Sequence, residues 1–261
     1  MYKRQILKTT LFLITVFLIG CSKTKTDDLQ SYPITLNFTQ NWDGTPVTAS
    51  DFGTFNYTNQ HGENLSITKL RYLLSRITLR RTNGETVELS NYNLIDMEDA
   101  NSLTFTTSED VLEGDFDNIS FVYGFNEEDN QDGVYSDLNV ANWNWPSMLG
   151  GGYHFMQFEG KFLDVNGDPQ PFAYHNGTAK ISEGNFEQNY VTFSFNQNFS
   201  INNATSIEIK MNIAEWFKNP NEWDLNVLNV TLMPNYQAQK MMQENAASVF
   251  SIGDIVTLLQ E

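Results

Sequence analysis

Short runs of alternating apolar and polar residues recur along most of the chain. Such alternation puts successive side chains on opposite faces of an extended backbone, which is typical of half-buried β-strands. Turn-forming residues separate the runs, and two of the turns contain Asn-Gly, at 83–84 and 166–167, a pair that favours a tight hairpin. Strands are predicted within residues 32–38, 65–82, 85–89, 92–97, 101–107, 117–125, 148–162, 169–182, 189–201 and 205–213.

Helical periodicity is confined to the C-terminal part of the chain. Residues 235–247 form the one convincing helix, and Asn235, which follows Pro234, is placed to cap its first turn. Many short strands at regular spacing, without alternating strand and helix units, favour sheets that pack on each other. We therefore expect an all-β protein, a single antiparallel β-sandwich-like domain with one short C-terminal helix.

The first residues have the composition of an export signal. The segment "MYKRQILKTTLFLITVFLIGC" combines a basic start with a short apolar run and ends in Cys21. This placement resembles that of the acylated cysteine in bacterial lipoproteins, although a plain signal peptide with a chance cysteine is the alternative. We expect a signal peptide at 1–20, an acylated cysteine and flexible tether at 21–31, and a folded domain at 32–261. The expected location is the outer membrane, with the domain facing the periplasm or the cell surface.

Composition narrows the functional classes. The formal net charge is −17 at pH 7, so the chain is a poor partner for nucleic acid or an anionic lipid surface. Cys21 is the only cysteine, so the domain relies on its core or on a bound ion rather than on disulfides. The sequence contains no nucleophile elbow, phosphate-binding loop or dinucleotide fingerprint. We therefore expect a binding protein and not an enzyme.

Two of the three histidines lie in segments that the turn at 166–167 would pair. His154 follows three glycines at the start of one predicted strand, and His175 lies near the end of the next. If the two strands form one hairpin, the imidazoles approach each other and suit copper or zinc. The alternative is two unrelated histidines, one half-buried and hydrogen-bonded and one on a loop, and spacing alone favours that alternative.

Two further segments carry candidate binding residues. The acidic loop "EEDNQDG" supplies Glu127, Asp129 and Asp132 before a glycine, which fits a calcium loop loosely and a solvated loop better. Trp143 and Trp145 are two positions apart and share a face if the backbone is extended. With nearby tyrosines they would form an exposed aromatic platform for a glycan or a partner protein, or they would pack into the core.

Several of these segments together resemble the MbnP-like copper-binding family of exported proteins, here in a lipid-anchored, Bacteroidetes-type form. The matching pieces are "YPITLNF", "GENLSITKLRYLLSRITL", "NISFVYGFNEEDN", "GGGYHFMQFEGKF", "FAYHNG" and "IKMNIAEWFKNP", in this order. The resemblance implies a β-rich exported protein that binds copper and works with a di-haem peroxidase-like partner. In relatives, that partner oxidises a tryptophan near the site to kynurenine, and histidines complete the coordination.

Residue by residue, the resemblance assigns His175 to the family's His-Leu-Gly motif and Tyr153 to its Gly-Tyr block. The chain departs from the family just before that block, where residues 148–151 contain no tryptophan. Trp143 and Trp145 lie upstream and, with Tyr153, are the candidates for a modified or aromatic site.

The expected function is therefore copper binding by an exported, lipid-anchored protein that acquires or handles copper. The expected ligands are His154 and His175, with Met148 as the third, because a soft thioether suits Cu(I). Met156, two positions after His154, is the second candidate for the thioether. The alternative function is a surface lipoprotein that binds a glycan or a partner protein through exposed aromatic residues, without a metal.

Overall fold

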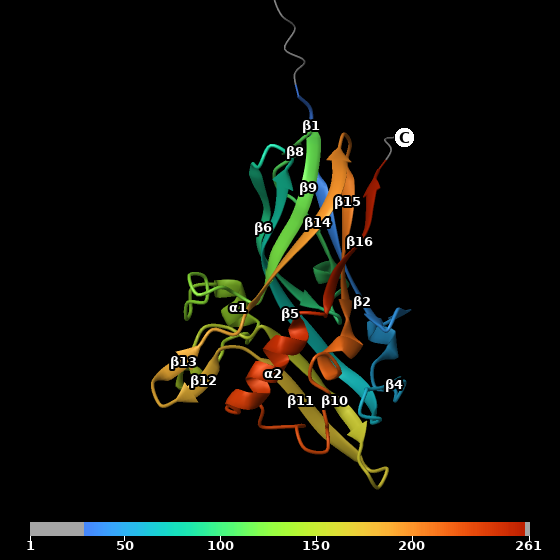
Figure 1. Cartoon of the computed structure of the whole chain (residues 1–261), viewed down its shortest axis with the longest axis vertical. Coiled ribbons are helices and arrows are strands. Elements are labelled where there is room, and N and C mark those ends of the chain that lie inside the picture. The colour runs from blue at the N-terminus through green and yellow to red at the C-terminus, as the bar shows by residue number, and fades with distance from the viewer. Residues whose placement is uncertain (1–28, 259–261) are drawn as a thin grey trace, which may run out of the picture.

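The computed structural model describes residues 29–258, in which nearly all regular structure is β-strand. Figure 1 shows long strands running along the long axis of the molecule, with both α-helices beside its lower half. The strands are β1 Ser31–Tyr32, β2 Ile34–Trp42, β3 Thr45–Pro46, β4 Tyr57–Thr58, β5 Asn64–Arg81, β6 Thr86–Asp96, β7 Thr104–Thr106, β8 Val111–Leu112, β9 Gly114–Tyr123, β10 Met156–Leu163, β11 Pro169–Asn176, β12 Ala179–Ser182, β13 Asn185–Glu187, β14 Val191–Ile201, β15 Thr205–Asn212 and β16 Phe250–Thr257. The helices are α1 Ser136–Val140 and α2 Tyr236–Ala246, with 3₁₀ turns η1 Ala49–Asp51, η2 Ala100–Leu103, η3 Ser147–Leu149 and η4 Ile213–Phe217.

Two sheets contain most of these strands. Within residues 29–258 one sheet is seven-stranded, with the order β11-β10-β5-β9-β14 and with β4 and β6 also paired to β5. The other is five-stranded, with the order β16-β15-β2-β3 and with β7 also paired to β2. Both sheets are built from antiparallel pairs, except that β2 and β15 run parallel. The all-β, sandwich-like prediction is confirmed.

Aromatic rings join the two sheets into one core. Phe250 of β16 contacts Tyr72 of β5, Phe121 of β9 and Phe193 of β14, with ring centroids 5.8, 5.8 and 5.3 Å apart. The facing strand β2 alternates buried and half-buried residues along its whole length, as a strand with one face on a core does. Because each aromatic side chain buries a large apolar area, such contacts stabilise sheet packing without any disulfide.

The predicted hairpins and the predicted helix are present. β5 and β6 pair across the turn at Gly84, and β10 and β11 pair from Met156 opposite Asn176 to Leu163 opposite Pro169. Helix α2 begins after Asn235, whose side chain accepts a hydrogen bond from the backbone N–H of Ala238 at 3.1 Å. The β10–β11 hairpin and α2 together position the candidate site.

Some details differ from the sequence prediction. Residues 86–96 form one strand, β6, because β5 is long enough to pair with both of the predicted segments. The chain continues after α2 into β16, which pairs with β15 and which the sequence pattern does not predict, since Gly253 interrupts the alternation. Over residues 29–258 neither α-helix has the length and apolar character needed to cross a membrane.

Candidate metal centre

The β10–β11 hairpin brings the two predicted histidines together. His175 lies on β11 opposite Gln157 of β10, and His154 lies just before β10 begins. The centroids of the two imidazole rings are 5.4 Å apart, and the rings meet edge to face. The pairing of the two segments around the 166–167 turn is therefore as predicted, and it places two nitrogen ligands within reach of one ion.

His154 is held in one neutral form. Its Nδ1 lies 3.1 Å from the backbone carbonyl oxygen of Trp143, and because a carbonyl only accepts, Nδ1 carries the proton. The lone pair of Nε2 is then free to bind a metal. Burial, together with the neighbouring His175, lowers the pKa of His154 to about 4. The imidazole is therefore uncharged at neutral pH, as a metal ligand must be.

His175 is oriented by a carboxylate. Its Nε2 lies 3.0 Å from Oε1 of Glu159 on β10, so Nε2 donates and Nδ1 has a free lone pair. Lys69 of β5 contacts the same oxygen at 3.1 Å. Burial favours a neutral Glu159 carboxyl, but the hydrogen bonds and charges of Lys69 and His175 outweigh it and lower its pKa. Burial lowers the pKa of His175, against the opposing effect of Glu159. A carboxylate that receives the second N–H of a histidine is the usual support of a metal-binding imidazole.

Trp143 and Trp145 both pack against His154, with ring centroids 5.6 and 4.9 Å from the imidazole. They share a face, and of the two predicted alternatives the core packing is confirmed and the exposed platform is wrong, because the two side chains are only 0 and 2% exposed. Nε1 of Trp145 donates to the carbonyl of Leu149 at 3.2 Å, whereas the buried Nε1 of Trp143 has no hydrogen-bond partner. Spacing two apart predicts a common face and does not say whether solvent or protein covers it.

The glycine-rich segment before His154 fits a narrow space. At Gly152 the backbone has φ of +80°, and a β-carbon there would overlap the side chain of Asn130. Asn130 accepts a hydrogen bond from the N–H of Tyr153 at 2.9 Å. Tyr153 is fully buried, and its hydroxyl accepts from the N–H of Tyr135 at 2.8 Å. The glycines therefore let the chain turn closely around Asn130 and deliver His154 to the interior.

A mostly apolar pocket of about 440 Å³ lies beside His175. His175 lines it, together with the two methionines Met148 and Met233. Met148 is 72% exposed, and Met233 is half-buried. Met156 is completely buried, and it does not line this pocket. The remaining lining residues are Pro146, Leu149, Ala173, Thr231, Leu232 and Pro234.

Sequence reasoning missed two residues of this site. Met233 lies in the loop before α2, far from the hairpin in sequence, and no local pattern links the two. Glu159 lies on β10 opposite Ala173, two positions before His175, so the register of the predicted hairpin is the signal that could have placed it beside His175.

Helix α2 fixes the end of β11 through one buried side chain. Nε2 of Gln239 donates to the carbonyl oxygen of His175 at 2.8 Å. Its Oε1 accepts from the side chain of Asn176 at 3.1 Å and from the N–H of Gly177 at 3.2 Å. Gln239 is 0% exposed, so these groups satisfy one another without solvent. The backbone that carries His175 is thereby anchored to the helix.

The acidic loop does not assemble the predicted calcium site. Asp129 pairs with Arg76, at 2.6 Å between Oδ2 and Nε, and Asp132 accepts from the backbone N–H of Gly152. Glu127 is exposed. Within residues 29–258, these carboxylates are not among the groups whose oxygens converge closely enough for a metal. The predicted lipidation site, Cys21, lies outside the described residues.

The arrangement around the hairpin fits a soft metal ion. Each imidazole has one N–H bound to an oxygen and one nitrogen free, so both tautomers are set for coordination. Imidazole nitrogens that share an ion lie at most about 4 Å apart, which the ring separation of 5.4 Å permits. Imidazole and thioether ligands in an apolar pocket favour copper over hard cations such as calcium.

Comparison with known proteins agrees with this fold. A solved structure, MbnP from Methylosinus trichosporium, matches with a TM-score of 0.57 and 11% sequence identity, over 86% of this chain and 99% of that one. At this identity the likeness shows the fold alone. No curated protein matches the chain. The family model for MbnP matches residues 31–238, most of the folded domain, and the chain therefore belongs to the MbnP family.

Proposed function

We propose that this protein binds copper through His154 and His175, with a methionine thioether from Met148 or Met233 as a further ligand. Membership in the MbnP family associates the chain with methanobactin-related copper handling. The proposed role is copper acquisition or handling by an exported protein that is anchored through Cys21 and has no catalytic turnover of its own.

One observation carries the proposal. Two neutral imidazoles lie with ring centres 5.4 Å apart, and one of them, His175, lines an apolar pocket that two methionines also line. Because each imidazole is already bound through its other nitrogen, little side-chain freedom is lost when a metal binds. Copper would supply the redox or transfer chemistry, and the chain's own residues would hold and orient it.

The test is a competition for Cu(I) under anaerobic conditions. The mature domain, without tag histidines, is titrated against a chromophoric Cu(I) chelator. The double variant His154→Ala/His175→Ala should bind Cu(I) more than about 100-fold more weakly, because losing a supporting residue alone costs 10–100-fold. The control Glu208→Gln changes a side chain on β15 of the other sheet and should leave the affinity unchanged. Equal affinity in wild type and the double variant would sink the proposal, provided that circular dichroism shows both to be folded.

The two tryptophans that pack against His154 are candidates for modification by a partner protein. We infer that a di-haem peroxidase-like protein oxidises Trp143 or Trp145 to kynurenine. With two equivalents of hydrogen peroxide as the oxidant, the indole ring opens to N-formylkynurenine and two waters, and hydrolysis then releases one ring carbon as formate, so that the residue gains one oxygen and loses one carbon. The unpaired Nε1 of Trp143 supports this, because an indole without a hydrogen bond is not held by its polar atom. Intact mass and peptide mapping of protein from the native host test it, and an unmodified mass at both positions would exclude the modification.

A further inference from the structure

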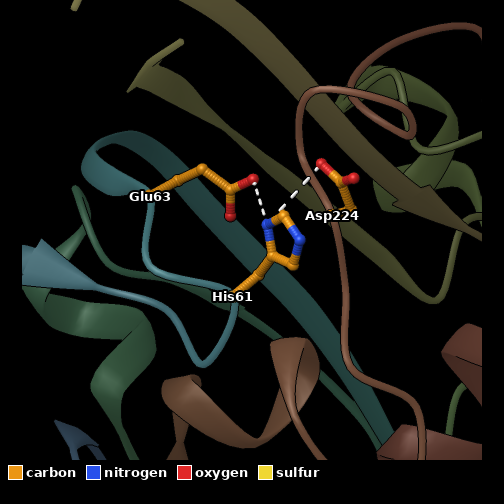
Figure 2. Close-up of side chains that lie close together, drawn as sticks. All are labelled: His61, Glu63 and Asp224. Carbon is orange, nitrogen blue, oxygen red and sulfur yellow. Dashed lines mark hydrogen bonds and ion pairs between the residues drawn. The ribbon is translucent and has the colours of Figure 1, made fainter. Parts of the chain in front are cut away.

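A second group of metal-ligand side chains lies at another place in the fold. His61 and Glu63 belong to the turn between β4 and β5, and Asp224 belongs to the loop between η4 and α2. Figure 2 shows the His61 ring between the two carboxylates. Nδ1 of His61 is 2.7 Å from Oε1 of Glu63 and 3.7 Å from Oδ1 of Asp224. One ligand atom from each residue lies within 4.8 Å of the others.

The backbones that carry these side chains are fixed relative to one another. Oδ1 of Asn59 accepts from the N–H of Glu63 at 2.8 Å, and its amide donates to the carbonyl of Trp223 at 3.2 Å. From the other loop, Asn226 donates to Oε1 of Glu63 at 2.8 Å. The geometry of the group is therefore set by the loops and does not depend on the contact between His61 and the carboxylates.

The Glu63 carboxylate has unmet bonding capacity. Its side chain is only 5% exposed, and its Oε2 has no hydrogen-bond partner. Over residues 29–258 no lysine or arginine pairs with Glu63 or Asp224, and His61 is the one positively chargeable group that contacts them. A protonated His61 neutralises the charge of one of the two carboxylates and leaves the charge of the other without a counter-charge. A buried, unpaired carboxylate oxygen is costly unless a cation binds it.

Space for an ion and its water is present beside the group. A pocket of about 200 Å³ is lined by His61, Glu63 and Asn226 on one side and by Asp164 of the β10–β11 turn on the other. Asp164 adds a further carboxylate to the wall of the pocket. A bound ion can therefore keep solvent ligands in addition to the three protein ligands.

We propose that His61, Glu63 and Asp224 form a second metal site, for a divalent first-row transition-metal ion of the zinc type. One imidazole nitrogen and two carboxylate oxygens are a common three-residue set for such ions. The imidazole disfavours calcium and magnesium, which select oxygen ligands, and the lack of sulfur disfavours Cu(I). The site is separate from the His154–His175 centre and does not depend on it.

The bound ion would join two distant parts of the chain. It connects the β4–β5 turn to the loop at 219–235, which has no regular secondary structure. The same loop continues to Met233 and forms one wall of the pocket at His175. Metal bound at the second site is expected to raise the melting temperature by roughly 5 °C at a hundredfold excess over its dissociation constant.

Zinc titration by isothermal calorimetry tests this proposal. The full mature domain is prepared as the His154→Ala/His175→Ala variant, so that the heat of zinc binding comes from the second site and not from the first. This protein should bind one zinc ion per chain. Adding His61→Ala should abolish the binding, and adding Asp224→Asn, which keeps the acceptor for the Asn226 N–H, should weaken it by at least about tenfold.

The matched control is Glu222→Gln. It removes a carboxylate that lies in the electric field of His61 but is not one of the three ligands, so binding should change less than about twofold. Loss of zinc binding in Glu222→Gln equal to that in Asp224→Asn would show a diffuse acidic patch and overturn the site. Absence of zinc binding before the His61 change, in protein with a normal melting curve, would also overturn it and would leave the copper proposal untouched.

Discussion

Burial keeps the His154 imidazole neutral, and metal binding requires the same neutral form. The imidazole is 6% exposed, and desolvation together with His175 lowers its pKa from an ordinary 6.5 to about 4. The folded protein therefore binds this proton more weakly than the unfolded chain does. The neutral form is available to a metal throughout the mildly acidic range, where an exposed histidine would already be charged.

The stability of the metal-free protein should therefore fall as the pH falls. His154 contributes no penalty above pH 6.5, where it is neutral in both states, and its penalty grows between 6.5 and about 4 as only the unfolded chain takes up the proton. The full effect is roughly 3 kcal/mol. Urea unfolding of chelator-treated wild type and His154→Gln at about pH 7.5 and pH 4.5 measures it. The wild type should lose more stability than the variant, and an equal loss in both would contradict the burial argument.

Glu159 is the residue that orients His175, and its effect should appear in metal affinity. Under the copper proposal, Glu159→Gln keeps the shape but replaces a charged acceptor by a neutral one, so Cu(I) affinity should fall by 10–100-fold. Glu208→Gln, on β15 of the other sheet, is a charge-matched control and should leave the affinity unchanged. An unchanged affinity in Glu159→Gln would show that His175 needs no carboxylate support.

At the scale of elements, the contact between α2 and β11 holds the site in place. Gln239 satisfies the His175 carbonyl, the Asn176 amide and the Gly177 N–H in a space that solvent does not reach. This explains why a helix of a β-protein matters for a site on a hairpin. Strand β11 is an edge strand, at one end of its sheet order. Helix α2 supplies hydrogen-bond partners that a neighbouring strand would otherwise supply to this edge.

Gln239→Met should destabilise the protein by roughly 2–4 kcal/mol, since it leaves several buried polar groups unpaired at nearly constant volume. Chemical denaturation at neutral pH measures the change. The control Gln237→Met lies on the exposed side of the same helix and should cost less than about 0.5 kcal/mol. Equal costs for the two variants would show that the Gln239 contacts are not important to stability.

The elements predicted most accurately are those that a few neighbouring residues determine. The Asn-Gly turn fixes the β10–β11 hairpin, and Pro234 and Asn235 fix the start of α2, so these follow from a few neighbouring residues. The parallel pairing of β2 with β15 has no local signal, because it joins strands from opposite ends of the domain. The same holds for the burial of Trp143, whose ring contacts Arg71 of the distant strand β5 at 5.0 Å.

At the scale of the whole molecule, the sequence predicted one site partly and the other not at all. His154 and His175 are linked by one turn, so pattern and family resemblance together suggested their approach. His61 and Glu63 share a turn, but Asp224 reaches them only because the loop before α2 packs against the β4–β5 turn, which no sequence pattern encodes. Loop-to-loop contacts of this kind require the assembled fold.

The position of Met148 has a consequence for how a metal enters and leaves. Its side chain is 72% exposed and lines the same pocket as His175, which is half-buried, whereas the neighbouring His154 is only 6% exposed. Accessibility therefore decreases in steps from a thioether at the surface to an imidazole in the interior. Under the copper proposal, an incoming ion can exchange one ligand at a time along this series, and a docking protein can offer its own ligand at the outer step. Delivery and release would then proceed by associative ligand exchange, without opening the β-sandwich.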